Sequence, residues 1–321
     1  MNLKRICICL LVFATVTVPV LAAGNSNVRV SSNAVITAQA TQDEGADYKA
    51  WYDANDAKDY AKAYDLAKAF IAKYPNSANV TYLKGWIPSV RGTLFNAALN
   101  AKDVKKMLDL GNEALAEDPN NIDYLYLLSV AIYSYEIAQK NNEHASQLVD
   151  FNKRIISLLD SGKVPAAFAT DKTFNKNNLS ASLYQQIGVV ELNNNQKDKA
   201  LEVFQKAASL NPKDAYNYLQ IGTLIYATKY IPASEKYGAF STEDKGSDKP
   251  EVKAALDEVN KQADVVIDNW AHYVALEASP AASIKSGLDT LYKFRHSDST
   301  EGLQKLIDQY KSGNGPVNPK P

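Results

Sequence analysis

The sequence predicts an all-α chain, a helical-repeat solenoid of antiparallel helix pairs that is closed by C-terminal capping helices. Three observations support this fold class. From Asp47 to Tyr310, apolar residues recur every three or four positions, which is the period of a helix with one buried face. The interruptions are clusters of Pro, Gly and Asn, which end helices. Part of the chain also repeats at a spacing of 34 residues, which is typical of stacked helical units.

The N-terminal 23 residues have the three-part layout of a secretory signal peptide. Lys4 and Arg5 come first, an apolar run over residues 6–21 follows, and the small residues Ala22 and Ala23 close it. The run is short for a membrane span. We therefore expect cleavage of residues 1–23, export to the periplasm or the outside of the cell, and no membrane insertion after cleavage.

The cysteines and the charge balance exclude several classes of function. Both cysteines, Cys7 and Cys9, lie in the leader, so the mature chain has no thiol for a disulfide, a metal ion or nucleophilic catalysis. Loss of Lys4 and Arg5 with the leader leaves a small excess of acidic side chains. This balance does not favour binding to nucleic acid or to an anionic membrane.

The rest of the chain divides by composition. Asn, Ser, Thr, Ala and Gln dominate the stretch after the leader, which predicts a flexible linker, and polar clusters separate the later helices. The predicted segments are the linker 24–46, the helical repeats 47–240, a polar loop 241–250, the C-terminal capping helices 251–311 and a disordered tail 312–321.

The internal repeat carries a recognisable pattern. Its residues are Tyr184, Ile187 and Gly188, their copies Tyr218, Ile221 and Gly222, and, after the first copy, Ala200, Phe204, Ala207 and Pro212. This arrangement resembles the tetratricopeptide repeat (TPR), although Glu191 stands where that family often has a second aromatic residue. The resemblance implies units of two antiparallel helices that stack side by side.

Small residues explain the spacing within one unit. Gly188 has no side chain and Ala200 and Ala207 have one methyl group each, so the two helix axes can approach closely. We expect Gly188→Leu to be strongly destabilising. The same change at Gly222 is expected to be milder, because the second helix that should follow it is less regular.

Weaker copies lie earlier in the chain. Ala63, Phe70 and Pro75 resemble the second half of one unit, and Ala114 and Pro119 resemble the end of another. The two prolines lie farther apart than one repeat. We therefore expect an insertion or an irregular helix between Pro88 and Lys102.

The sequence contains no motif of a known catalytic class. It has no phosphate-binding glycine loop, no Gly-x-Ser-x-Gly and no His-Glu-x-x-His, so we predict a protein that is not an enzyme and has no catalytic residues, cofactor or metal. The three histidines are far apart in the sequence. His272 lies four residues after Asp268, which predicts a surface ion pair on one helix face.

Polar and aromatic residues at first-helix positions are the candidate binding site. In the TPR family these positions line a concave groove that receives peptides, which implies binding by Tyr126, Tyr133, Gln185, Asn193, Tyr216, Gln220 and Tyr226. Packing of these tyrosines between neighbouring units is an equally good alternative.

The resemblance and the leader together predict a protein-interaction scaffold of the cell envelope. Its partner would be a protein or peptide, held in the concave groove. The alternative is a protein that binds a glycan or another small polar ligand, because sugar sites also use Tyr with Asn and Gln.

Overall fold

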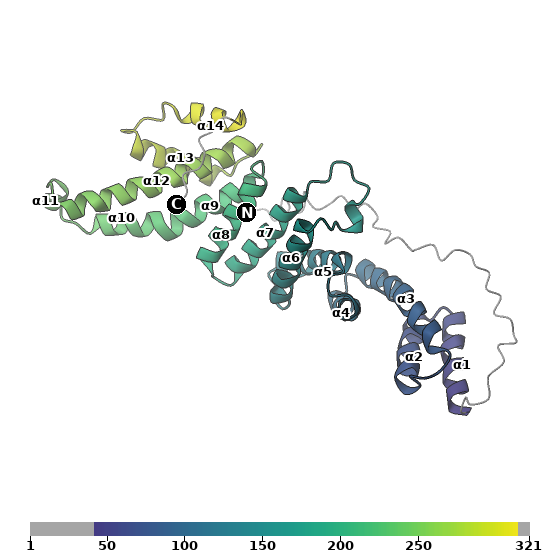
Figure 1. The fold of residues 1–321 in the computed structure, drawn as a ribbon. Coiled ribbons are helices and arrows are strands. Elements are labelled where there is room, and N and C mark those ends of the chain that lie inside the picture. Colours follow the sequence, from purple (N-terminus) through teal and green to yellow (C-terminus); the bar gives the residue numbers. More distant parts are fainter. Residues whose placement is uncertain (1–41, 314–321) are drawn as a thin grey trace. The chain divides into compact units, whose positions relative to one another are not determined.

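The computed structural model describes residues 42–313, and every regular element in that range is a helix (Figure 1). This confirms the all-α prediction. None of the described helices is both long enough and apolar enough to cross a membrane. The predicted leader 1–23 lies outside the described residues, as do most of the linker and most of the tail. Helix α1 begins at Gln42, so the linker prediction is wrong for residues 42–46.

The described chain forms two compact units. Unit 1 holds residues 42–135 together with Asp160–Lys172, and unit 2 holds Glu136–Leu159 together with residues 173–313. The division falls inside the segment 47–240, which the sequence analysis treats as a single stack.

Unit 1 is a series of helices in which each packs against the next. They are α1 (Gln42–Asp56), α2 (Tyr60–Lys73), α3 (Val80–Ala101), α4 (Val104–Glu117) and α5 (Ile122–Tyr135), with the 3-10 turn η3 (Ala166–Phe168). Aspartate caps begin two of them. The side chains of Asp59 and Asp103 accept hydrogen bonds from the backbone N–H groups of Lys62 and Lys106, which satisfies donors that a helix start leaves unpaired.

Helix α3 accounts for the extra residues between the first two predicted units. It runs for 22 residues, whereas α2 and α4 have 14 each, and it contains Pro88 in its interior. Proline removes one hydrogen bond from a helix interior. The extra residues expected between Pro88 and Lys102 therefore belong to one long, continuous α-helix that runs through the proline.

Unit 2 contains the strong repeat and the C-terminal helices. Its elements are η2 (Ile137–Gln139), α6 (Ala145–Asp160), α7 (Lys176–Asn193), α8 (Lys197–Leu210), α9 (Ala215–Ile225), the π-helical turn η4 (Tyr226–Tyr230), α10 (Ile231–Gly238), α11 (Thr242–Lys245), α12 (Pro250–Leu276), α13 (Ala282–Arg295) and α14 (Leu303–Lys311). The short helix α11 lies in the predicted polar loop 241–250, and α12 to α14 form the predicted helices of segment 251–311.

Helices α7 and α8 pair as the repeat pattern predicts. A Cβ atom built on Gly188 would lie 2.7 Å from the ring of Phe204, which is fully buried. Ala200 and Ala207 are also fully buried on α8. The expected close approach of the two helices at Gly188 is confirmed.

The second copy of the repeat differs from the pattern. Helix α9 does not turn back after Gly222, because η4 carries the chain directly into α10. Both α9 and α10 pack against α12 instead, and a Cβ atom on Gly222 would lie 2.5 Å from the ring of Trp270. Helix α12, predicted as part of a cap, therefore takes the place of the missing second helix.

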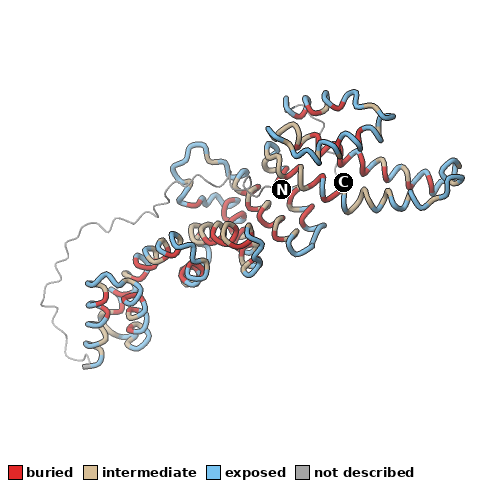
Figure 2. Tube along the Cα trace, turned by 180° about the vertical axis from the view of Figure 1, so that it is seen from behind, coloured by how far each residue is buried: buried red, intermediate tan, exposed pale blue. Residues whose placement is uncertain are grey.

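The pattern of buried residues agrees with these helix pairs. Buried residues concentrate on the facing sides of helices, whereas the end of the α10–α12 hairpin nearest to α11 is mostly exposed or intermediate (Figure 2). Trp270, Leu288, Leu291, Ile307 and Tyr310 belong to one buried cluster that joins α12, α13 and α14 to the repeat helices. The C-terminal helices thus share the core of unit 2.

Candidate functional site

The seven predicted groove residues lie in both units. Tyr126 and Tyr133 belong to unit 1, and the other five belong to unit 2. Tyr133 is buried, with 8% of its surface exposed. The ring of Tyr126 lies edge-on to Phe168, with 5.3 Å between the ring centres, and burial raises its pKa. Both rings therefore contribute to packing inside unit 1.

The two tyrosines of unit 2 also have aromatic neighbours. The ring of Tyr216 lies edge-on to Phe204 at 5.9 Å between centres. Tyr226 stacks on Tyr230 at 5.3 Å and lies against Trp270 at the same centre distance. These contacts match the packing alternative, in which tyrosines fill the space between neighbouring helices.

Two of the predicted amides, Gln185 and Asn193, have hydrogen-bond partners within unit 2. The Gln185 side chain donates to the carboxylate of Asp214 at 2.7 Å and to the Asn217 carbonyl oxygen at 3.0 Å. The Asn193 side chain donates to that of Asn142 at 3.0 Å. Gln220 is half-buried. The donors of Gln185 and Asn193 are thus used in the protein itself.

We expect Tyr226→Ala to lower the free energy of unfolding by about 2 kcal/mol, because a partly buried ring between Tyr230 and Trp270 is lost. Chemical denaturation measures this change. The matched control is Tyr226→Phe, which keeps the ring and should stay near the wild-type stability. An alanine variant as stable as the wild type would contradict the packing role and return Tyr226 to the candidate binding residues.

A different aromatic group is exposed to solvent. Tyr52 on α1 and Tyr82 on α3 have 48% and 57% of their surfaces exposed, and Trp86, one turn after Tyr82, is half-buried. We call these three residues the aromatic surface. Exposed aromatic rings that gather on one surface are typical of binding sites.

The buried ring of Trp51 packs against all three residues of the aromatic surface and holds them in position. It is 2% exposed, and its ring contacts those of all three surface residues at centre distances of 6.4 Å to Tyr52, 5.8 Å to Tyr82 and 5.4 Å to Trp86. The contacts are edge-to-face, which is a favourable geometry for aromatic pairs. The surface rings are therefore held in place before any ligand arrives.

Polar atoms accompany the exposed rings. Burial raises the pKa of Tyr48, and the nearby Tyr82 and Tyr52 raise it further. The indole Nε1 of Trp51 is buried and has no hydrogen-bond partner among the described residues. The site thus combines apolar faces with several hydroxyl groups.

An ionic network holds the helices that support this surface. The buried Arg91 guanidinium on α3 binds both carboxylate oxygens of Glu117 on α4 and donates to the Tyr64 hydroxyl on α2 at 3.0 Å. The Tyr64 hydroxyl in turn donates to Glu113 at 2.5 Å, and burial raises the pKa of Tyr64 to about 12. A bidentate arginine connects helices with defined geometry, so the network keeps α2, α3 and α4 in register.

The sequence analysis missed the aromatic surface, although a signal was present. Tyr48 with Tyr52, and Tyr82 with Trp86, are aromatic pairs spaced four residues apart, which places both members on one helix face. A helix that carries two such rings needs a neighbouring apolar element or a ligand. The repeat alignment did not show this, because its recognisable residues lie later in the chain.

Asp268 and His272 do not form the predicted surface ion pair. Asp268 is 8% exposed and accepts a hydrogen bond from the Tyr310 hydroxyl. The His272 ring is stacked between Tyr218 and Tyr310, with centre distances of 3.6 and 4.2 Å. Burial lowers the pKa of His272 to about 4, so the histidine is neutral at pH 7. The prediction is wrong because both groups lie under α14.

A second histidine lies beside acidic residues. The Nδ1 atom of His144 lies 2.8 and 2.9 Å from the two carboxylate oxygens of Glu136, and Glu143 adds a carboxylate to the same group. Glu136 is buried, and its contact with His144 satisfies it without an ion. We therefore assign the group a structural role.

Comparison with known proteins does not identify a family. No protein-family model matches the chain, and no curated protein matches it. The function is therefore inferred from the residues of this chain alone.

Proposed function

We propose that the protein is an exported TPR-like helical-repeat scaffold of the cell envelope, which binds a partner protein or peptide and performs no catalysis. The α7–α8 pair, with Phe204 seated on Gly188, supports the repeat assignment. The predicted leader supports the location. A stack of helix pairs offers an extended surface, which is how repeat proteins bind their partners.

The aromatic surface is the observation that carries this proposal. Tyr and Trp lose little conformational entropy when they are covered, because each has only two side-chain torsions. Here the rings of Tyr52, Tyr82 and Trp86 are already oriented by Trp51, so binding orders little that is not ordered beforehand. The partner segment is proposed to lie across α1 and α3, and the tyrosines 126, 133, 216 and 226 serve chiefly as packing residues.

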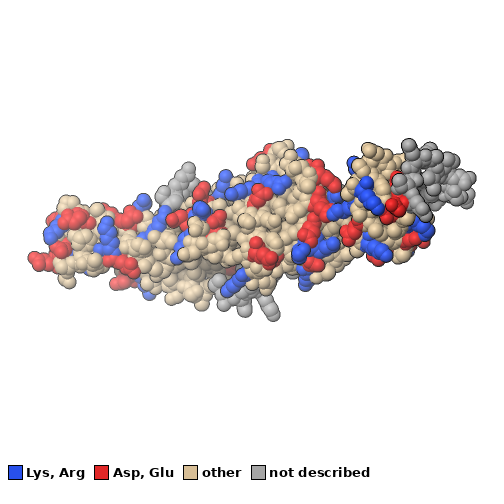
Figure 3. Space-filling model, turned by 90° about the horizontal axis from the view of Figure 1, so that it is seen from below, with Lys and Arg blue, Asp and Glu red and all other residues tan. Residues whose placement is uncertain are grey.

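Charge has a small part in the proposed recognition. On the face shown in Figure 3, Lys and Arg side chains are interspersed with Asp and Glu, apart from one narrow band of acidic side chains. The cationic group of Arg91 is paired with Glu117. Binding should therefore depend only weakly on salt concentration, because screening acts on long-range charge attraction.

A glycan is the second candidate ligand. Exposed tyrosine and tryptophan faces can stack on sugar rings, and the hydroxyls of the nearby residues Tyr48, Tyr52 and Tyr82 can exchange hydrogen bonds with them. The same surface would serve either ligand. A peptide ligand and a glycan ligand can be told apart by testing which kind of molecule binds to the aromatic surface.

Selection of a random peptide library on the purified protein tests the proposal. Peptides that bind the wild type should lose at least about tenfold in affinity for the double variant Tyr52→Ala with Tyr82→Ala, since each exposed ring acts as an anchor. The matched control is Phe294→Ala, which removes an exposed ring of α13 outside the surface. Its affinity should be that of the wild type.

A parallel test with oligosaccharides distinguishes the glycan from the peptide. Oligosaccharides from chitin and from peptidoglycan are tested in parallel on the same three proteins. Binding of an oligosaccharide that the double variant loses, with no selected peptide, would replace the peptide proposal by the glycan. Selected peptides that bind the double variant as tightly as the wild type would exclude the aromatic surface as the docking site.

A further inference from the structure

The predicted linker is joined directly to the helix that carries Tyr52. Its part outside the described residues, 24–41, ends where α1 begins at Gln42. Small and polar residues dominate this segment, but four β-branched apolar residues interrupt them, namely Val28, Val30, Val35 and Ile36. Such side chains gain free energy when an apolar surface covers them. The linker therefore contains residues that favour contact with exposed rings.

The lengths of the linker and of α1 allow this contact within one molecule. Tyr52 lies ten residues after Gln42, which is about 15 Å along the helix axis. Ile36 lies six residues before Gln42, and six residues of extended chain span about 20 Å. A linker that turns back along α1 therefore brings Val35 and Ile36 level with Tyr52.

The exposed rings lie on a face of α1 that such a linker would follow. Tyr48 and Tyr52 are spaced four residues apart and share this face; Tyr48 is half-buried and Tyr52 is exposed. Neighbouring residues of an extended backbone point to opposite sides. One of Val35 and Ile36 can then meet Tyr52 on α1 while the other meets Tyr82 on α3. Contacts between aromatic and β-branched side chains are favourable.

The charges of the linker and of α1 are complementary. The linker has one charged side chain, that of Arg29, and no carboxylate. Helix α1 has five carboxylates and one lysine, which are Asp43, Glu44, Asp47, Asp53 and Asp56 with Lys49. The attraction between unlike charges favours a linker that lies along α1 over one that points away from it.

We propose that the linker docks on the aromatic surface of its own molecule through Val35 and Ile36, and that a partner segment must displace it. The displacement rests on the proposed function, whereas the contact itself does not. Because the linker is tethered at Gln42, its effective concentration at the surface is on the order of millimolar, so a weak contact is enough to cover the rings for most of the time.

Hydroxyl-radical footprinting of the mature chain, residues 24–321, tests the contact, with mass spectrometry as the readout. Tyr52 and Tyr82 should be oxidised at least about threefold faster in a truncated chain that begins at Gln39, because the linker no longer covers them. Phe294 on α13 is an exposed ring and serves as the internal reference, with equal rates in both chains. Equal rates of Tyr52 and Tyr82 in the two chains would overturn the proposal.

Substitutions in the linker show which side chains make the contact. Val35→Ser with Ile36→Ser should expose the rings as much as the truncation does, because the apolar side chains are lost. The matched control is Ala34→Ser with Ala38→Ser, which changes two small residues of the same stretch and should leave the rings protected. Protection that grows with protein concentration would assign the contact to the linker of a second copy and contradict docking within one molecule.

Peptides selected on the purified protein measure the displacement. They should bind the truncated chain at least about threefold more tightly than the mature chain, because the apparent affinity scales with the fraction of open surface. Equal affinities for the two chains would reject the regulatory role of the linker. If the rings are protected in the mature chain but no peptide can be selected even on the truncated chain, the proposed function fails and the docking contact stands.

Discussion

Gly188→Leu should lower the free energy of unfolding of unit 2 by about 3 kcal/mol, which is at the upper end of the usual cost of overpacking a core. The first added atom would already lie 2.7 Å from Phe204, and ordinary carbon contacts need more than 3.4 Å. Phe204 is fully buried, so its ring has no free space into which it could move. The helices α7 and α8 must therefore separate, and urea denaturation followed by circular dichroism measures the cost.

The control for this prediction is Gly238→Leu. Gly238 ends α10 in the same unit, and a Cβ atom built there meets nothing within 4 Å. The same substitution should therefore leave the stability almost unchanged. Equal effects at Gly188 and Gly238 would show that the loss does not come from the approach of α7 and α8.

Gly222→Leu should cost as much as Gly188→Leu. The sequence analysis expects a milder effect, because the helix after Gly222 is irregular. In the structure the neighbour is Trp270, at 2.5 Å from the built Cβ atom, and this ring is 5% exposed. A core tryptophan is at least as difficult to displace as a core phenylalanine, so the expected order of the two variants is corrected.

Removal of Asp268 or His272 should change the pH dependence of stability in opposite directions. Burial raises the pKa of Asp268 from 3.8 to about 7, so between these values the folded protein holds a proton that the unfolded chain has lost. Stability from this group therefore falls as pH rises from about 4 to 7. Burial lowers the pKa of His272 from 6.5 to about 4, so between these two pH values this histidine is protonated only in the unfolded chain. The contribution of His272 to stability therefore rises with pH. The contributions of Asp268 and His272 nearly cancel in the wild type.

Single variants separate the two contributions. Relative to the wild type, Asp268→Asn should gain about 1 kcal/mol per pH unit between pH 4 and 6.5, and His272→Phe should lose a similar amount per unit, as follows from proton linkage. Phenylalanine keeps a ring between Tyr218 and Tyr310. Denaturation at several pH values measures both differences, and comparison with the wild type cancels the titration of all other groups.

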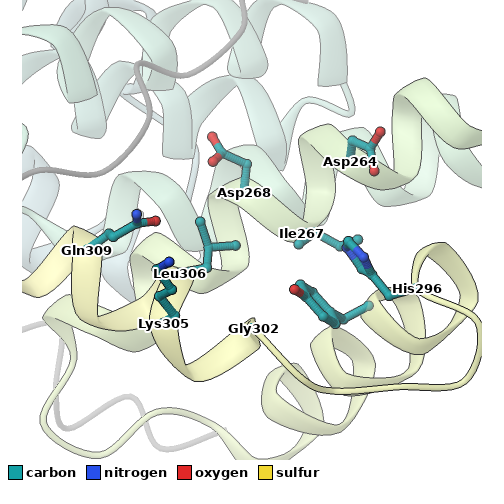
Figure 4. A pocket seen from close by; sticks show the side chains of 9 residues that line it. Asp264, Ile267, Asp268, His296, Gly302, Lys305, Leu306 and Gln309 are labelled. Carbon is teal, nitrogen blue, oxygen red and sulfur yellow. The ribbon is translucent and has the colours of Figure 1, made fainter.

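This prediction also depends on the titratable groups that lie near Asp268 and His272. The Tyr310 hydroxyl of α14 binds Asp268, and Asp264 is paired with Arg295. Burial raises the pKa of Tyr218 on α9 to about 12, so this hydroxyl stays neutral between pH 4 and 7. Lys305 and His296 line the same hollow between α12, α13 and α14 as Asp268 (Figure 4). Two flat profiles, or two differences of the same sign, would contradict the opposite pKa shifts of Asp268 and His272.

Local residue patterns were enough to predict the helices and one helix pair. The period of apolar residues depends only on helix geometry, and the small residues Gly188, Ala200 and Ala207 show directly where another helix comes close. Extra residues near Pro88 were also predicted, because the spacing of the prolines did not fit one repeat, and they lie in the long helix α3. Each of these predictions rests on residues within about two neighbouring helices.

The sequence by itself determined that the chain is helical and that the helices now seen as α7 and α8 meet at Gly188. The tertiary structure alone decided which element covers each helix face. It placed Trp270 of α12 on Gly222, buried Asp268 and stacked the half-buried His272 against Tyr310 of α14, and left Tyr52 and Tyr82 exposed. The physical reason is that periodicity shows which side chains share a face, whereas burial, pKa and exposure depend on a covering element that can come from a distant part of the chain.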